Sequence, residues 1–361
     1  MRNSSITQLR VSVLELDFKI PITSALGTYT GSDYVVVELI TSDSVRGYGY
    51  TTSLDRRGTK AVVSYIENEL APIAIGSSID DPQNLWQKMW SPNKPRMRGG
   101  VGVHALSTVD IAVWDALAKT KNVPLVVLLG GAIEEVPVYG SGGWLSMDDS
   151  ELVAEAMNFV EKGIKGYKIK IGGPRDIDRV QLLRQEFGGS LALYVDANQR
   201  YSVSEALIAS RWLADLDVKW LEEPVLADCP WLMEEVAKQS SVPIAAGENV
   251  YFLWGFEDLC NREALRYIQP DVGRCGGITE WKKISDLASD RKLRVTSHLL
   301  HEVSASLVAS SPAGFAIEYM DFFEENPFTH NFLISNGKCK IPNSLGHGVE
   351  FSSEAFAKYK V

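Results

Sequence analysis

The feature of this sequence that most constrains its fold is an alternation of strand-like and helix-like segments that begins near residue 134. Short runs rich in β-branched and aromatic residues recur at intervals of about 20 to 30 residues, with amphipathic stretches such as SELVAEAMNFVEKG between them. We expect the strands in VPVYGSG, GYKIKIG, LALYVDAN, VKWLEEPV, VPIAAGEN, RYIQPDV, LRVTSHLL and FAIEYM. Repeated βα units of this kind favour a closed parallel barrel. A doubly wound open sheet is the alternative, but we find no GxGxxG motif that opens a helix after the first strand.

The part of the chain before about residue 131 has a different pattern, with strands first and helices afterwards. LRVSVLELDF and YVVVELITS have strand character, and the second turns through SDSVRG into GYGYTTS as a hairpin. Helical stretches come next, and in one of them Leu106, Val109, Val113 and Leu117 recur at helical spacing. We expect a small α+β domain, with GTYTGSDY and YTTSLDRRGT as loops that cover a site. After the eighth barrel strand we expect no helix, only a tail that returns to this domain.

Composition and charge exclude several classes of partner. The net charge of −10 argues against nucleic acid and against an anionic membrane surface, so a small molecule is the expected partner. The N-terminus has no apolar signal region and no stretch approaches 18 uninterrupted apolar residues, which predicts neither export nor a membrane span. The four cysteines have no CxxC or disulfide-framework spacing. We interpret them as free thiols of a cytoplasmic protein.

Polar side chains fall near the carboxyl ends of the expected barrel strands. In such barrels these ends meet at one mouth, where the active sites of known enzymes lie. Side chains alternate across a strand, so the two lysines of GYKIKIG point the same way. The polar residues so placed are Lys168, Lys170, Asp196, Asn198, Glu222, Glu248, Asp271, His298 and Glu318.

Three of these residues form a regular acidic series. Asp196, Glu222 and Glu248 are separated by about 26 residues each, roughly one βα repeat, so they should come from neighbouring strands and converge. Converging carboxylates repel one another unless a cation lies among them. Oxygen ligands without Cys or His indicate Mg²⁺, with Mn²⁺ as a substitute, and disfavour Zn²⁺. Lys168 and Lys170 would then face a strongly anionic site, which explains two neighbouring ammonium groups.

The motifs KIK, VDAN, EEP, GEN, IQPD followed by GG, SH, and a Glu on the last strand resemble those of the enolase superfamily, specifically its mandelate racemase subgroup. The resemblance spans nearly the whole chain. It implies an α/β fold with a (β/α)8-type TIM barrel, in the modified (β/α)7β form, beneath an α+β capping domain. The capping domain would comprise residues 1–131, joined by the tail 331–361, and the catalytic barrel residues 132–330.

The resemblance also implies a role for each matching residue. Asp196, Glu222 and Glu248 would bind Mg²⁺. Lys170 would be a base on one face of the substrate, and Lys168 would hold the substrate carboxylate and keep the pKa of Lys170 low. On the other face His298, oriented by Asp271, would act as base or acid. Glu318 would hydrogen-bond the substrate carboxylate, and Asn198 would contact the metal-bound end or the α-hydroxyl.

The implied reaction is abstraction of the proton α to a carboxylate through an enediolate, which the superfamily carries out with Mg²⁺ and a Lys or His base. We expect an acid-sugar dehydratase that yields a 2-keto-3-deoxy acid, working as a homo-oligomer. A racemase or epimerase of a 2-hydroxy acid is the alternative, because the same residues serve either outcome. The cycloisomerase branch is disfavoured, because it places a lysine near the end of the sixth strand, where this chain has Asp271 and Arg274.

Other interpretations of single residues also exist. Lys168 and Lys170 alone fit a solvated edge strand, an isolated acidic residue fits a helix cap or surface charge, and His298 alone fits an interior histidine. A metal-stabilised binding module without catalysis leaves Lys170, Asp271 and His298 without a task. A metal-dependent phosphate-ester hydrolase is a further alternative, but this sequence offers a single carboxylate site, whereas such enzymes often use a pair of metals.

Overall fold

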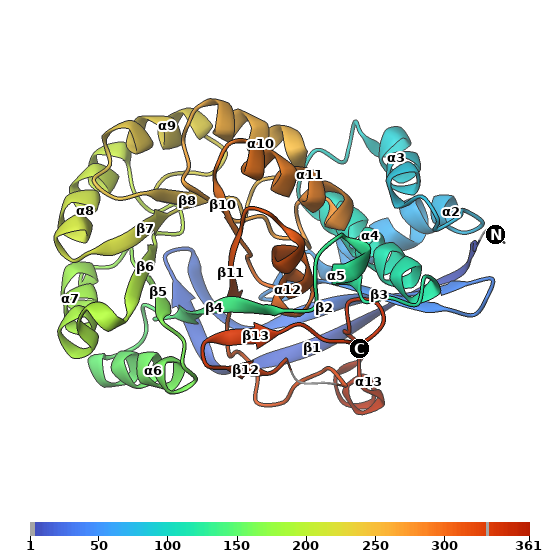
Figure 1. Cartoon of the computed structure of the whole chain (residues 1–361), viewed down its shortest axis with the longest axis horizontal. Coiled ribbons are helices and arrows are strands. Elements are labelled where there is room, and N and C mark those ends of the chain that lie inside the picture. The colour runs from blue at the N-terminus through green and yellow to red at the C-terminus, as the bar shows by residue number, and fades with distance from the viewer. Residues whose placement is uncertain (1–3, 330–331) are drawn as a thin grey trace.

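The computed structural model describes residues 4–329 and 332–361, and its centre is a closed barrel of parallel strands (Figure 1). Closure comes from β11 and β4, which pair in parallel with Ile317 opposite Val138. This confirms the predicted barrel and excludes the open sheet, because the first and last strands are hydrogen-bonded to each other. The barrel strands are β4 (Glu135–Gly142), β5 (Gly166–Lys170), β6 (Ala192–Asp196), β7 (Val218–Glu222), β8 (Ile244–Ala246), β9 (Tyr267–Ile268), β10 (Arg294–Thr296) and β11 (Gly314–Tyr319).

Each barrel strand except the last is followed by a helix on the outside of the barrel. Capping boxes begin two of these helices: Asp148 with Glu151, and Ser202 with Glu205, satisfy backbone N–H groups that the first turn leaves free. The described residues between β11 and β12 form no helix, which confirms the (β/α)7β form. The helices are α6 (Asp149–Glu161), α7 (Asp176–Phe187) with the short η2 (Gly188–Ser190), α8 (Val203–Asp215), α9 (Pro230–Gln239), α10 (Phe252–Asn261), α11 (Gly277–Asp290) and α12 (His301–Ser310).

The N-terminal part combines a three-stranded antiparallel sheet with a layer of helices. Helix α4 packs closely on β3, because Gly47 and Gly49 have no side chain; a Cβ at Gly49 would lie 2.1 Å from the carbonyl oxygen of Thr108. Helix α4 has the length and apolar composition of a membrane span, but 83% of that window is buried, as in a core helix. The elements are β1 (Ile6–Ser24), β2 (Gly27–Thr41), β3 (Arg46–Leu54), α1 (Thr59–Tyr65), η1 (Ile66–Leu70), α2 (Ala71–Ala74), α3 (Pro82–Asn93), α4 (Val101–Thr120) and α5 (Leu125–Leu128).

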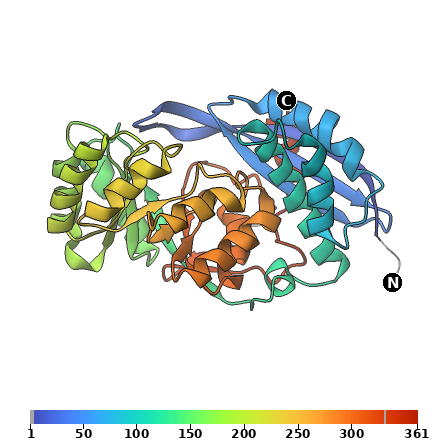
Figure 2. The same cartoon turned by 90° about the horizontal axis from the view of Figure 1, so that it is seen from above.

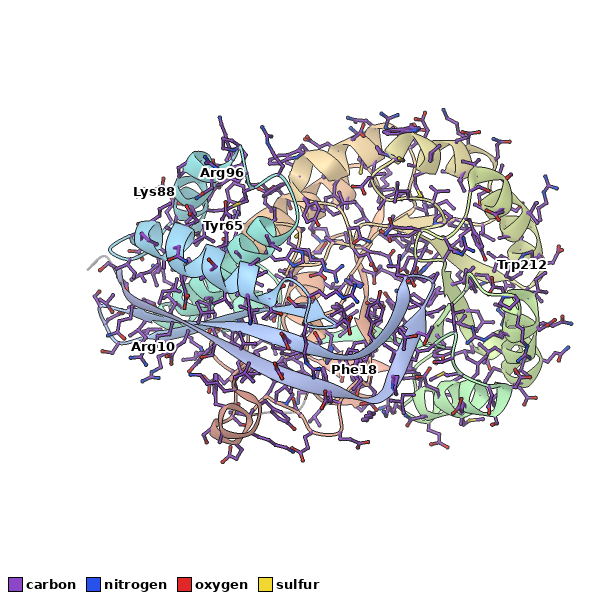
Figure 3. The ribbon with its side chains drawn as sticks, turned by 180° about the vertical axis from the view of Figure 1, so that it is seen from behind. Arg10, Phe18, Tyr65, Lys88, Arg96 and Trp212 are labelled. Atoms are coloured by element: carbon purple, nitrogen blue, oxygen red, sulfur yellow. The ribbon has the colours of Figure 1, made fainter. Side chains whose placement is uncertain are left out.

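A long hairpin formed by β1 and β2 extends from this sheet across the barrel (Figure 2). The segment GTYTGSDY, expected as a loop, belongs to β2 instead. Its alternating threonine and tyrosine residues suit a strand, and they pair with β1 up to the tip at Ser24 and Gly27. The N–H of Leu145, just after β4, donates to the carbonyl of Thr23 at 2.8 Å. The hairpin therefore reaches the barrel mouth as ordered structure, and Figure 3 shows Phe18 along it.

The C-terminal tail contacts both parts of the molecule. It contains β12 (Ile334–Ser335), β13 (Lys338–Lys340) and the helix α13 (Ser353–Tyr359). Strand β13 pairs antiparallel with β4, whereas α13 packs on β1. The sequence analysis expected a return to the N-terminal part but no helix; α13 begins where the hydroxyl of Ser352 accepts the N–H of Ala355. The proposed division between 330 and 331 lies outside the described residues. All four cysteines are free thiols, as expected.

Candidate metal centre and active site

Three carboxylates converge at the mouth of the barrel. Asp196 ends β6, Glu222 ends β7 and Glu248 lies two residues after β8. One oxygen of each lies within 4.8 Å of one oxygen of each of the others, and the exposed fractions of the three residues are 0%, 1% and 7%. Three buried like charges at this separation repel one another, and a divalent cation relieves that repulsion. The trio is positioned as a metal site, and its all-oxygen donor set fits Mg²⁺.

The two lysines of β5 both point into this acidic centre. The Nζ of Lys168 lies 2.5 Å from Oε1 of Glu222 and 2.7 Å from Oε1 of Glu318. The Nζ of Lys170 lies 2.5 Å from Oδ2 of Asp196. Burial alone would lower the pKa of Lys168, but the nearby carboxylates of Glu222 and Glu318 outweigh it and raise that pKa well above its usual value. Lys168 is therefore a fixed cation beneath the site.

His298 reaches the same centre at another member of the carboxylate trio. Its Nδ1 lies 2.8 Å from Oδ2 of Asp271, and its Nε2 lies 3.0 Å from Oε2 of Glu248. The other oxygen of Asp271 accepts the N–H of Gly273 at 2.7 Å, which fixes this carboxylate. Burial alone would lower the pKa of His298, but Glu248 and Asp271 outweigh it and raise the pKa to about 10. A carboxylate behind the ring fixes its orientation and stabilises the imidazolium.

Asn198 and Glu318 complete the predicted set. The backbone of Asn198 has a left-handed conformation with φ of 42°, which asparagine tolerates. Its N–H and its side-chain Nδ2 both donate to Asp196, at 2.8 and 3.2 Å. Its Oδ1 is buried and has no hydrogen-bond partner among the described residues, so it is available to a ligand. Glu318 accepts a hydrogen bond from the N–H of Leu299 at 3.1 Å. Burial alone would raise the pKa of Glu318, but Lys168 outweighs it and the pKa is lowered to about 2.

Aromatic side chains fill the barrel directly below the acidic centre. The rings of Tyr194 and Trp220 stack with centroids 3.7 Å apart, and the ring of Tyr139 lies 5.9 Å below the ammonium of Lys168. The indole N–H of Trp220 donates to Glu222 at 3.1 Å. Burial against this aromatic layer raises the pKa of Glu222 to about 7, although Lys168 opposes that rise.

The protonation of Lys170 differs from the sequence-based expectation. A low pKa was expected, because Lys168 and Mg²⁺ would both repel a proton on Lys170. Among the protein's own groups, burial lowers the pKa of Lys170, but Asp196 outweighs it and the pKa is raised. The reason is the direct contact with Asp196, which the sequence could not show. A lowered pKa therefore depends on neutralising the Asp196 charge.

Three further residues at the site were not assigned a role from the sequence. Glu223 is fully buried beside the trio and accepts two hydrogen bonds from Nδ2 of Asn249, at 2.8 and 3.1 Å. The ring of Trp144 lies 5.4 Å from the ammonium of Lys170. The Nε of Arg274 lies 3.2 Å from Oδ2 of Asp271, the oxygen that also faces His298. The sequence pattern could have indicated them by their position, because each follows a barrel strand within a few residues.

The position of the site residues along the strands also needs one correction. Glu248, Asp271 and His298 were expected at strand ends, but they lie two or three residues beyond β8, β9 and β10, whose last residues are Ala246, Ile268 and Thr296. The backbone leaves the ladder early there, which lets these side chains turn towards the centre of the mouth.

Comparison with known proteins identifies the family of the chain. Residues 7–130 match the family model "Mandelate racemase / muconate lactonizing enzyme, N-terminal domain", and residues 151–355 match "Enolase C-terminal domain-like". The 3,6-anhydro-alpha-L-galactonate cycloisomerase of Streptomyces coelicolor is 32% identical over 95% of this chain and 97% of its own. The arabinonate dehydratase of Saccharolobus solfataricus is 31% identical over 91% of both chains.

Solved structures agree with this assignment. A racemase from Streptomyces coelicolor with bound magnesium superimposes with a TM-score of 0.95 and 30% identity, over 99% of this chain and 100% of that one. The L-talarate/galactarate dehydratase of Salmonella typhimurium gives a TM-score of 0.93 with 28% identity, over 100% and 93%. Two relatives are named cycloisomerases, so the outcome that the sequence disfavoured occurs among the proteins that this chain resembles. The chain belongs to the mandelate racemase and muconate lactonizing enzyme family of the enolase superfamily.

Proposed function

We propose that this protein is a Mg²⁺-dependent sugar-acid dehydratase that removes the proton α to a carboxylate and then expels the β-hydroxyl, giving a 2-keto-3-deoxy acid. One observation carries the proposal. Lys170 and His298 contact two different members of one carboxylate trio, Asp196 at 2.5 Å and Glu248 at 3.0 Å. Two proton-handling groups therefore border one cation position, as two-sided chemistry at a single carbon requires.

The chemical demand explains the charged groups below the substrate. Removing a proton α to a carboxylate puts a second negative charge on an anionic group, so that charge must be stabilised. Mg²⁺ held by Asp196, Glu222 and Glu248 would supply part of this stabilisation. The fixed ammonium of Lys168 supplies more, and Glu318, held by Lys168 and the Leu299 N–H, borders the place where the substrate carboxylate lies.

The remaining residues handle protons and orientation. Lys170 takes the α-proton as the neutral amine, once the charge of Asp196 is neutralised, and the ring of Trp144 lies 5.4 Å from its Nζ. His298, oriented by Asp271, protonates the departing hydroxyl from the opposite face. The free Oδ1 of Asn198 accepts a hydrogen bond from the α-hydroxyl of the substrate. The relatives named as dehydratases of arabinonate and of talarate and galactarate support this outcome.

A racemase or epimerase of a 2-hydroxy acid is the second candidate. It is favoured by the same two-sided arrangement, because His298 could return a proton to the α-carbon instead of protonating a hydroxyl. The name of the magnesium-bound structure from Streptomyces coelicolor points the same way. Both candidates share the first proton transfer, and they differ only in the fate of the enediolate that it produces.

Three further expectations accompany this function. We propose that residues 1–131 and 331–361 act as the cap and 132–330 as the catalytic barrel, which the long hairpin over the mouth supports. We propose that the partner is a small sugar acid and that the enzyme is cytoplasmic, in keeping with its free thiols. A homo-oligomer is proposed from the family resemblance, and light scattering at several protein concentrations tests it.

A library screen tests the proposed function. The purified protein is incubated with Mg²⁺ and a set of mono- and diacid sugars, and keto acids are detected with semicarbazide. A dehydratase forms a keto acid from at least one substrate, and chelation of the metal abolishes it. A racemase instead exchanges the α-hydrogen with solvent deuterium and forms no keto acid. Absence of both keto acid and exchange across the library refutes the proposal.

A further inference from the structure

A cavity of about 420 Å³ lies beside the acidic centre, between the N-terminal sheet and the carboxyl ends of β10 and β11. Glu318 belongs to both places: its carboxylate contacts Lys168 in the centre, and the residue lines the cavity. Leu299, whose N–H donates to Glu318, also lines it. A substrate with its carboxylate near Glu318 would therefore have this cavity within reach of its other end.

The cavity wall is largely aromatic. The rings of Phe18 and Phe322 stack with centroids 4.8 Å apart, and the ring of Tyr34 meets that of Phe323 edge-on at 5.7 Å. Phe18 lies on the long hairpin, so the capping sheet supplies part of the wall (Figure 3). Flat aromatic faces in a pocket bury C–H groups of a ligand and leave its orientation to a few polar groups.

The polar groups of the wall include carboxylates and hydroxyls, besides Lys19 and His301. Glu302 is buried, accepts the hydroxyl of Tyr50 at 2.6 Å and lies 3.1 Å from Nε2 of His301, which fixes its carboxylate. Tyr34 and Thr52 sit opposite each other on β2 and β3. The hydroxyl of Tyr34 has no hydrogen-bond partner among the described residues, although only 8% of the residue is exposed. This hydroxyl faces the cavity and is not among the buried unpartnered atoms, so it is open to a hydrogen bond from a ligand that enters.

The charge of the cavity sets the kind of ligand. Besides Glu318, which pairs with Lys168 and borders the reacting carboxylate, its described lining includes the carboxylates of Glu302, Asp321, Glu324 and Glu325. The one lysine or arginine of that lining, Lys19, already pairs with Asp321 at 2.9 Å. Carboxylates accept hydrogen bonds from hydroxyl groups but repel a second carboxylate. The repulsion is strongest at the buried Glu302, because Asp321, Glu324 and Glu325 are exposed to solvent and Glu325 pairs with Lys358 at 2.8 Å.

We propose that this cavity holds the neutral polyhydroxyl end of the substrate, so that the enzyme acts on sugar monoacids and discriminates against the corresponding diacids. This inference rests on the proposed function, because it places the reacting carboxylate at Glu318. The hydroxyl groups of the substrate donate to Glu302 and accept from Tyr34 and Thr52, while its C–H groups pack on the aromatic wall. A terminal carboxylate in the same place would face fixed negative charge.

Matched acid pairs test the inference in the wild-type holoenzyme. Each pair has the same configuration along the chain and differs only at the last carbon, as gluconate and glucarate do, or galactonate and galactarate. We expect kcat/KM with Mg²⁺ to be at least about 100-fold higher for the monoacid of the preferred pair. Equal or faster turnover of the diacid overturns the inference and leaves the proposed function intact. Failure of every acid to exchange its α-proton or form a keto acid overturns both.

Two variants locate the effect. Glu302→Gln removes one negative charge and should lower the monoacid preference about tenfold or more. Tyr34→Phe removes only the hydroxyl and should raise KM for the polyhydroxy acid with a smaller change in kcat. Glu235→Gln, at an exposed position on α9 outside the cavity, is the matched control and should leave the preference unchanged. If Glu302→Gln does not fold, the wild-type ratio and Tyr34→Phe still decide; an unaltered KM in Tyr34→Phe contradicts the assignment of the cavity.

Discussion

Replacing Lys168 by methionine gives a sharp test of the charge balance below the site. Lys168 is fully buried and contacts Glu222 at 2.5 Å and Glu318 at 2.7 Å. Removing one partner of a buried ion pair leaves uncompensated charge and costs about 3–5 kcal/mol. For 361 residues the entropy of unfolding is about 0.76 kcal/mol/K, so the midpoint of thermal unfolding should fall by about 4–7 °C.

The assay is thermal unfolding followed by circular dichroism, in EDTA, so that no divalent ion replaces the missing charge. Lys219→Met on the barrel strand β7 is the matched control: its side chain is 44% exposed and pairs with Asp217 at 2.5 Å. A surface pair of this kind contributes at most about 1 kcal/mol, so the control should shift by less than about 1.5 °C. If both variants unfold within about 1 °C of the wild type, the buried pairs do not stabilise the fold as argued.

Three further predictions concern the metal, the cap and the tail. Glu222→Gln should remove most of the rise in unfolding temperature that Mg²⁺ gives the wild type; an undiminished rise in a Mg²⁺ titration would place the ion elsewhere. Gly49→Ala should cost about 1–3 kcal/mol in urea unfolding, because its Cβ would meet the Thr108 carbonyl, whereas Gly189→Ala, with open space around it, should cost little. Burial lowers the pKa of His347, so between pH 6.5 and that lowered value the unfolded chain binds more protons and the free energy of unfolding falls as the pH falls. His347→Gln should reduce this dependence by up to about 1.4 kcal/mol per pH unit. Urea unfolding at pH 5.5 and 7.5 measures it, and the same loss of free energy of unfolding in the variant and the wild type would contradict the prediction.

The sequence predicted the barrel well because its evidence is repetitive. The βα rhythm fixes strand order, and one chemistry-bearing residue per strand places Asp196, Glu222 and Glu248 together without any knowledge of distances. The same logic extends to Lys170 and His298, which the structure brings to two different members of the trio. These inferences depend only on topology, which the residue pattern encodes along the chain.

Features that depend on contacts between distant segments were not predictable in this way. Strands were expected in LRVSVLELDF and YVVVELITS, but the segment GTYTGSDY near the hairpin tip was expected as a loop. That tip is held by Leu145, more than a hundred residues away, which the local pattern does not show. Helix α13 is short and gains its stability from packing on β1. The raised pKa of Lys170 results from one contact with Asp196, and Trp144 gains its role only by lying over that lysine.

The most direct test of the account is the fate of the α-proton in single-base variants, followed by proton NMR in D₂O with Mg²⁺. The account places Lys170 and His298 on opposite faces of one carbon. Lys170→Ala should therefore retain exchange only with acids of one configuration at the α-carbon, and His298→Asn only with acids of the other. Loss of exchange for both configurations in each variant, or retention of both, would contradict the two-sided site.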